Sequence, residues 1–123
     1  MPGNGGVSFP KRGDVFITSF DPAAGAEIQK TRPALILQND IANQYGSITI
    51  VAAITSQTRD LRRPTTVGVR APEGGLTADS AILLNQIRSI DKQRLIRRVG
   101  ALKPGTMASV DRALRISLGL LKI

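Results

Sequence analysis

Two apolar runs, ALILQ at residues 34–38 and SITIVAAIT at residues 47–55, decide how this chain folds. Neither run alternates strictly between apolar and polar side chains, which is typical of central strands covered on both faces. The segment between them, NDIANQYG at residues 39–46, is predicted to hold a short helical turn. The three segments together predict the middle of a β-sheet.

Further strands are predicted on either side of this pair. Residues 14–20 (DVFITSF) are rich in β-branched and aromatic side chains and run into an Asp-Pro turn signal. Residues 65–69 and 80–84 are predicted as short strands, and residues 86–99 are interpreted as strand, turn and strand. In residues 21–33 the apolar pattern fades, so we expect a long loop over one end of the sheet.

The chain is expected to end in an amphipathic helix. Pro104 suits the first turn of a helix. Strands followed by a terminal helix indicate a mainly β fold with helices (α+β), an antiparallel sheet or half-barrel against which the helix packs. Apolar side chains at spacings of three and four form the predicted packing face: Met107, Val110, Leu114, Leu118 and Leu121.

The length of 123 residues fits one domain. Residues 1–10 combine Gly, Asn, Pro and Ser without periodicity, so we expect a flexible leader followed by a single domain at residues 11–123. No apolar run approaches the roughly 20 residues of a membrane span, and the first residues lack the features of a signal peptide. We therefore expect a cytoplasmic protein.

Composition narrows the chemistry. The chain has no Cys and no His, which excludes disulfides, thiolate or imidazole metal ligands, a Cys nucleophile and a His general base. No cofactor or metal is expected. The net charge of +8 favours an anionic partner such as nucleic acid, an acidic protein or an anionic lipid.

Arg32 and Thr55 are the first candidates for a site. Arg32 precedes Pro33, which biases its backbone toward an extended form, and its guanidinium is able to grip a phosphate through two donors. Thr55 closes the most apolar run and begins the polar stretch TSQTRD. If the two central strands are neighbours, both side chains share one opening. The alternative is a surface charge and a good β-forming residue.

The sequence resembles the MazF (PemK, Kid) family of bacterial toxins. The resemblance runs from about Lys11 to Leu121 and is carried by KRGDVFITSFDPAAGAEIQKTRPALILQNDIANQYGSITIVAAITSQ, LTADSAILLNQIRSIDKQRL and MASVDRALRISLGL. It implies an SH3-like β-barrel with helices, a homodimer, and sequence-specific cleavage of single-stranded RNA by an endoribonuclease (mRNA interferase). In that family the Arg of the RP dipeptide and the Thr that ends the AAIT strand carry the reaction, here Arg32 and Thr55.

The resemblance implies further site residues. Glu27 matches the acidic residue of a loop motif, with Ala26 where the family has another small residue. Phe20 and Pro22 match positions that open the loop, where a base is expected to stack, and Gln86 matches a residue lining the RNA groove. Phe20 has the alternative of a core aromatic, and Gln86 that of capping a strand end.

RNA carries its own nucleophile, the 2′-hydroxyl, so a protein that positions it and neutralises the phosphate needs no metal. We expect Arg32 to stabilise the pentavalent phosphorane and to donate to the leaving 5′-oxygen, and Thr55 to bond a non-bridging oxygen. Glu27 either orients Arg32 or accepts the proton of the 2′-hydroxyl. The expected products are a 2′,3′-cyclic phosphate and a 5′-hydroxyl. Basic side chains expected to follow the RNA backbone are Arg59, Arg62, Arg63, Lys92, Arg94, Arg97 and Arg98.

The sequence leaves two alternative functions open, and the resemblance implies one protein partner. A gyrase poison of the CcdB type has a similar fold but depends on a C-terminal Trp-Gly-Ile, whereas this chain has no Trp and ends Leu-Lys-Ile. The other rival is a basic nucleic-acid-binding module without catalysis. An acidic, partly disordered antitoxin of the MazE type is expected to cover the RNA groove through a salt-sensitive association.

Overall fold

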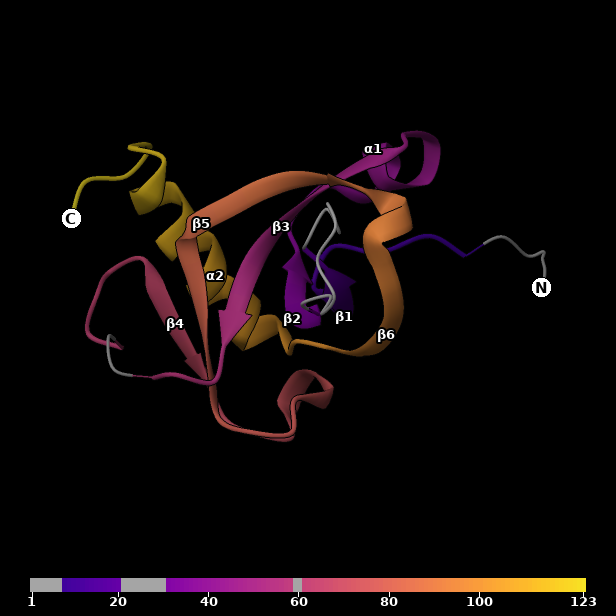
Figure 1. Cartoon of the computed structure of the whole chain (residues 1–123). Coiled ribbons are helices and arrows are strands. Elements are labelled where there is room, and N and C mark those ends of the chain that lie inside the picture. Colours follow the sequence, from indigo (N-terminus) through magenta and orange to yellow (C-terminus); the bar gives the residue numbers. More distant parts are fainter. Residues whose placement is uncertain (1–7, 21–30, 59–60) are drawn as a thin grey trace.

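Six antiparallel strands form one sheet in the order β4-β5-β3-β2-β1-β6 (Figure 1). The computed structural model describes residues 8–20, 31–58 and 61–123. The two apolar runs lie at the centre of the sheet, as predicted. In chain order the elements are β1 (Asp14–Ser19), β2 (Thr31–Ile36), α1 (Asp40–Tyr45), β3 (Ile48–Thr55), β4 (Thr66–Val69), η1 (Glu73–Gly75), β5 (Ser80–Asp91), η2 (Lys92–Arg94), β6 (Leu95–Ala101) and α2 (Pro104–Ser117).

Two strands are longer than the sequence pattern predicts. β2 begins at Thr31, so Arg32 lies within a strand rather than at the end of a loop. Pro33 is tolerated there because the pairing of β2 with β3 begins only at Ala34. The predicted strand 80–84 and the first strand of residues 86–99 are one element, β5, which turns through η2 into β6.

The sheet is open, so the expected barrel is wrong in one respect. β4 and β6 are its two edges, and within the described residues these edges do not pair with each other; Figure 1 shows them on opposite sides of the sheet. The turn η1 packs against β6 instead. A Cβ added to Gly100 of β6 would lie 2.4 Å from the backbone carbon of Gly74, so this close approach requires glycine.

The two faces of the sheet bury different clusters. On one face α2 packs against β4 and β5 (Figure 1) and covers a cluster that includes Leu35, Ala52 and Ile82. The opposite face carries a smaller cluster built on Ala34 and Val51, because alternate residues of a strand point to opposite faces. A sheet buried on both faces explains the continuous apolar runs of β2 and β3.

The C-terminal helix is confirmed, but part of its predicted packing face is wrong. Val110 is buried as expected, with Met107 and Leu114 partly buried, and Ala113 completes the face. The helix ends at Ser117, and Gly119 follows with a φ of 77°. The exposed Leu118 and the later Leu121 therefore lie outside the packed turns: Leu118, Gly119, Leu120 and Leu121 close the end through backbone bonds.

Residues just before β1 contact the fold. Of the predicted leader, residues 1–7 lie outside the described residues, whereas Pro10 is buried. The backbone N–H of Lys11 donates to Oδ2 of Asp14 (2.9 Å), which fixes the entry into β1. In the part of the chain that the structure describes, no helix has the length and apolar character needed to cross a membrane.

Glu73 joins η1 to the start of α2. Its Oε2 accepts the backbone N–H of Lys103, the residue before the helix (2.9 Å). A hydrogen bond with the side chain of Thr106 lowers the pKa of Glu73 below its ordinary value of 4.5; burial opposes this shift, and the backbone N–H and charge of Lys103 add to it. Glu73 thus caps α2 from another element.

Replacing Glu73 by Gln tests this cap. Because the folded-state pKa is lowered, the stabilisation is present above the unfolded pKa and is lost as the pH falls through the folded value. At pH 7 we expect Glu73→Gln to lower Tm by about 4 °C. The difference from wild type should shrink as the pH falls below 4.5 in calorimetric scans. A difference in Tm that is the same above and below pH 4.5 would contradict the role of the Glu73 carboxylate charge.

Candidate active site

Arg32 and Thr55 lie on adjacent strands and face the same side of the sheet. The register pairs Ala34 with Ala53, and continuing it by two residues sets Arg32 opposite Thr55. Arg32 shares a face with Ala34, and Thr55 shares that face with Ala53 and Val51. Both residues line each of two neighbouring cavities. The adjacency on which the sequence argument depended is present.

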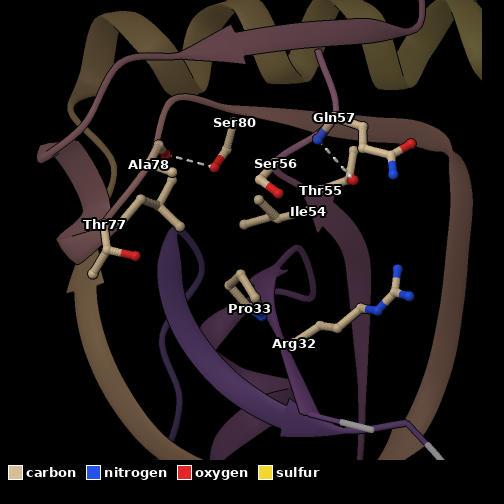
Figure 2. A pocket seen from close by; sticks show the side chains of 10 residues that line it. Arg32, Pro33, Ile54, Thr55, Ser56, Gln57, Thr77, Ala78 and Ser80 are labelled. Atoms are coloured by element: carbon tan, nitrogen blue, oxygen red, sulfur yellow. Dashed lines mark hydrogen bonds between the residues drawn. The ribbon is translucent and has the colours of Figure 1, made fainter. Parts of the chain in front are cut away.

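The hydroxyl oxygen of Thr55 already accepts one hydrogen bond. It is the last residue of β3 and half-buried. The backbone N–H of Gln57 donates to its Oγ1 (3.1 Å), which Figure 2 shows as a dashed line. A hydroxyl has one proton to donate and two lone pairs that accept. The bond from Gln57 therefore fixes the oxygen while its proton remains available to an acceptor on a ligand.

Arg32 brings positive charge to this opening. Its side chain is exposed and, in Figure 2, extends from β2 toward the side on which Gln57 lies. On the other side of β2 its register partner is the buried Thr18. Among the described residues, no carboxylate lines either cavity. The guanidinium is thus positioned to bind an anion through two parallel donors.

The larger cavity, about 530 Å³, extends from this pair over β5 and β4. The pairing of β3 with β5 shifts its register in this part of β5: Ala52 pairs with Ile87 while the next residue, Ala53, pairs with Leu83. The intervening part of β5 bulges, and bulges re-aim side chains. As a result the exposed amides of Asn85 and Gln86 reach the cavity. Its other lining residues are Arg32, Thr55, Gln57, Arg63, Thr66, Ala81 and Leu83.

The smaller cavity, about 390 Å³, lies beside the same pair. Figure 2 shows Thr77, Ala78 and Ser80 on the side of it that is opposite Arg32 and Thr55. These residues come from the segment that leads from η1 into β5. Two parts of the chain far apart in sequence therefore form its walls: Arg32, Pro33 and Ile54 to Gln57 on one side, and Leu76 to Ala78 with Ser80 on the other.

The structure brings some of the sequence candidates together and separates others. Gln86 and Arg63 line the larger cavity with Arg32 and Thr55, whereas Arg62 is exposed and is not part of the lining. Pro22, Glu27 and Arg59 lie outside the described residues.

Phe20 is half-buried and packs against the cluster of Ala34 and Val51, which fits its alternative as a core aromatic. The guanidinium carbon of Arg88 lies 5.3 Å from the centroid of the Phe20 ring. The ring thus already has a cationic neighbour at the distance of a cation–π contact.

Most of the basic side chains in the cluster at residues 92–98 have structural contacts. Nζ of Lys92 donates to the backbone oxygen of Asn43 (2.6 Å), and Arg94 donates to that of Ser19 (3.3 Å). Arg98 forms an ion pair with the buried Asp14 (3.0 Å). Arg97 is exposed on the edge strand β6. The cluster therefore ties elements together more than it extends the site.

Sequence reasoning missed several lining residues. Ser56 and Gln57 follow Thr55 directly, so the polar stretch after the strand was a usable signal. Nothing in the sequence connects Thr77 and Ala78 to that stretch, because the connection exists only once β5 pairs with β3. Among the described residues, no group of three or more acidic side chains lies together in a way that could hold a metal ion.

The arrangement suits the stabilisation of charge on a phosphate. A guanidinium and a hydroxyl on adjacent strands are two donor groups that line the same cavities. Donors fixed by the sheet need little reorganisation when negative charge develops on the oxygens of a reacting group. No described carboxylate competes for Arg32 in these cavities.

Comparisons with known proteins agree on one family. Residues 11–118 match the sequence model described as "PemK-like, MazF-like toxin of type II toxin-antitoxin system". The chain is 47% identical over 111 residues to Endoribonuclease EndoA of Bacillus subtilis, covering 90% of this chain and 96% of that protein.

Solved structures show the same architecture. A MazE-MazF structure from Deinococcus radiodurans (Form-II) matches with a TM-score of 0.76 and 26% identity, over 91% of this chain and 97% of that chain. An endoribonuclease in complex with its cognate antitoxin, from Mycobacterial species, matches with a TM-score of 0.76 over 93% and 99% of the two chains. At 24% identity the latter supports the fold alone.

Proposed function

This chain belongs to the family of PemK-like, MazF-like toxins of type II toxin-antitoxin systems, and from that membership we propose that it cleaves single-stranded RNA as an endoribonuclease. The proposal is supported by the relative from Bacillus subtilis, an endoribonuclease with which it has 47% identity. The observation that carries it is the pairing of Arg32 and Thr55 at one opening of the sheet.

The proposed reaction uses the nucleophile that RNA supplies. The 2′-oxygen forms a bond to phosphorus, its proton passes to a base, and the bond from phosphorus to the 5′-oxygen breaks. The 5′-oxygen takes up a proton, so the products are a 2′,3′-cyclic phosphate and a 5′-hydroxyl. Arg32 neutralises the phosphorane and donates to the leaving oxygen. The Thr55 proton bonds a non-bridging oxygen, which fits the way Gln57 engages the other side of that hydroxyl.

Glu27 stays our candidate for orienting Arg32 or for accepting the proton of the 2′-hydroxyl, although it lies outside the described residues. A guanidinium remains protonated at ordinary pH, so Arg32 itself is a poor base. We place the RNA backbone along the larger cavity, where Arg63 adds a second cation and Gln86 offers an amide to base edges. In bacteria RNA is made and used in the cytoplasm, where we propose the protein acts.

The rival functions fit less well. Membership of the toxin family and the identity with EndoA point to a nuclease rather than to a gyrase poison of the CcdB type. A non-catalytic nucleic-acid-binding module would need the positive charge but not a guanidinium and a hydroxyl that line one cavity.

Cleavage of a long single-stranded RNA tests the proposed reaction. We expect the rate to fall by at least about 100-fold in Arg32→Ala and in Thr55→Val, since each removes a donor to the phosphorane. Arg32→Lys keeps the charge but loses the planar pair of donors, so it should remain at least about tenfold slower than wild type. Denaturing gels measure the rate, and end-group analysis should find the cyclic phosphate.

The matched control is Arg112→Ala, which removes an exposed Arg of α2 that lines neither cavity and should cleave at the wild-type rate. Activity should persist in excess chelator, because the proposed roles need no metal. Full activity of Arg32→Lys, or activity abolished by the chelator, would count against the mechanism.

We also propose a homodimer, formed through the end of β3 that is far from Thr55. The apolar side chains of Ile41, Tyr45, Ile48 and Ile50 are exposed there. Such a group of apolar side chains is typical of an interface. An interface at this end would leave the cavities at the Thr55 end open to RNA.

Light scattering tests this surface. Wild type should have twice the chain mass of 13.1 kDa. Ile41→Glu combined with Tyr45→Glu should give a monomer, because both side chains are highly exposed and a buried charge would oppose association. The control Ile123→Glu, at the exposed C-terminal residue, should stay dimeric. A double variant that remains dimeric would place the interface elsewhere.

The second proposed partner is an acidic antitoxin of the MazE type. The similar structure from Deinococcus radiodurans is a MazE-MazF structure, and this chain carries a net charge of +8. Association between such partners is electrostatically steered. Titration of the purified toxin with its antitoxin should show affinity falling as salt rises. An affinity that does not change with salt would argue against a charge-driven interface.

A further inference from the structure

The smaller cavity beside Arg32 and Thr55 is a second, differently built compartment of the same site. We propose that it holds the base of a nucleotide next to the scissile phosphate, and that Thr77 and Ala78 help to set which base is accepted. This inference rests on the proposed function. The preference for a particular RNA base would then come from the wall of the smaller cavity that the segment between η1 and β5 forms.

The two cavities differ in charge. The larger one is lined by Arg32 and Arg63 and by exposed amides, a set that suits phosphates and polar base edges. In the smaller one Arg32 is the only charged residue among the described lining. It lies at the junction with the larger cavity, where the scissile phosphate is placed. The remainder of the smaller cavity is therefore suited to a neutral group rather than to a second phosphate.

The walls of the smaller cavity match the chemistry of a base. Pro33, Ile54 and Leu76 contribute apolar surface on which a flat ring packs. Hydroxyl groups of Ser56 and Thr77 offer both donors and acceptors to its edge. The volume of about 390 Å³ lies within the range of about 300 to 1,000 Å³ of small-molecule sites.

One wall is held rigidly by contacts outside the cavity. Oδ1 of Asp79 accepts the backbone N–H of Ala71 (3.0 Å), which closes the segment on itself. The carboxylate of Glu73 accepts the backbone N–H of Lys103, just before α2. A Cβ on Gly75 would lie 2.0 Å from the backbone oxygen of Val99, so the turn touches β6 directly.

Inside the cavity, the hydroxyl of Ser80 donates to the backbone oxygen of Ala78 (2.8 Å; Figure 2). Ser80 is almost fully buried. Ala78 is thus fixed at both the turn and the strand, and a wall held in this way discriminates by shape because it does not yield to a larger group. Ala78 is therefore placed to limit the size of the base, and the hydroxyl of Thr77 to select a base by its hydrogen-bonding groups.

Cleavage of a randomised RNA pool, with sequencing of the new ends, tests the inference. Ala78→Leu narrows the cavity and should change the preference at one of the two nucleotides flanking the cut by about tenfold or more, with larger bases losing more than smaller ones. Thr77→Val removes a hydroxyl at nearly constant volume and should change the preference at that same nucleotide. Other positions should keep their wild-type preferences.

The controls separate this inference from the proposed function. Ala108→Leu makes the same change at an exposed position of α2 and should leave every preference unchanged. Thermal unfolding checks that each variant is folded. If wild type cleaves and Arg32→Ala does not, yet both cavity variants keep the wild-type preferences at both flanking nucleotides, the base-binding role is wrong while the nuclease stands. If wild type does not cleave RNA at all, the proposed function itself fails.

Discussion

The antiparallel pairing of β2 with β3 is the contact on which the site depends. It sets Ala34 against Ala53, and the same register carried to the strand ends sets the guanidinium of Arg32 against the hydroxyl of Thr55. A shift by one residue would turn one of the two side chains to the opposite face, where the core under α2 lies. The burial of both strands on both faces makes such a shift costly, so the core that stabilises the sheet also fixes the geometry of the reacting groups.

Other elements form the surroundings of Arg32 and Thr55. The bulge in β5 turns Asn85 and Gln86 toward one cavity, and the anchored segment after η1 forms the wall of the other. Anionic groups are used away from these cavities in the described chain: Asp14 pairs with Arg98, Asp111 with Arg12, and Glu73 caps α2. The described lining around Arg32 thus carries positive and no negative side chains, which suits a polyanionic substrate.

Local pattern was sufficient to predict most of the elements. The apolar runs of β2 and β3, the short helix between them and the start of α2 at Pro104 are all found where composition indicated. The predicted ends of strands were wrong where tertiary contacts override the local preference of the sequence. Pro33 sits within β2, and β5 runs continuously through a segment that reads as two strands, because its neighbour β3 is long enough to pair with both halves. The predicted barrel stays open because η1, not a strand, packs against β6.

The sequence by itself determined the chemistry available to this protein: no thiol, no imidazole, an excess of cationic side chains, and an Arg and a Thr at the ends of two apolar strands. Those properties belong to residue types and spacing, which a linear pattern carries. Only the tertiary structure decided that Ser56 and Gln57 share a cavity with Thr77 and Ala78, and that Glu73 caps a helix that begins some thirty residues later. Such neighbours arise from strand pairing and packing between distant segments, and no local spacing encodes them.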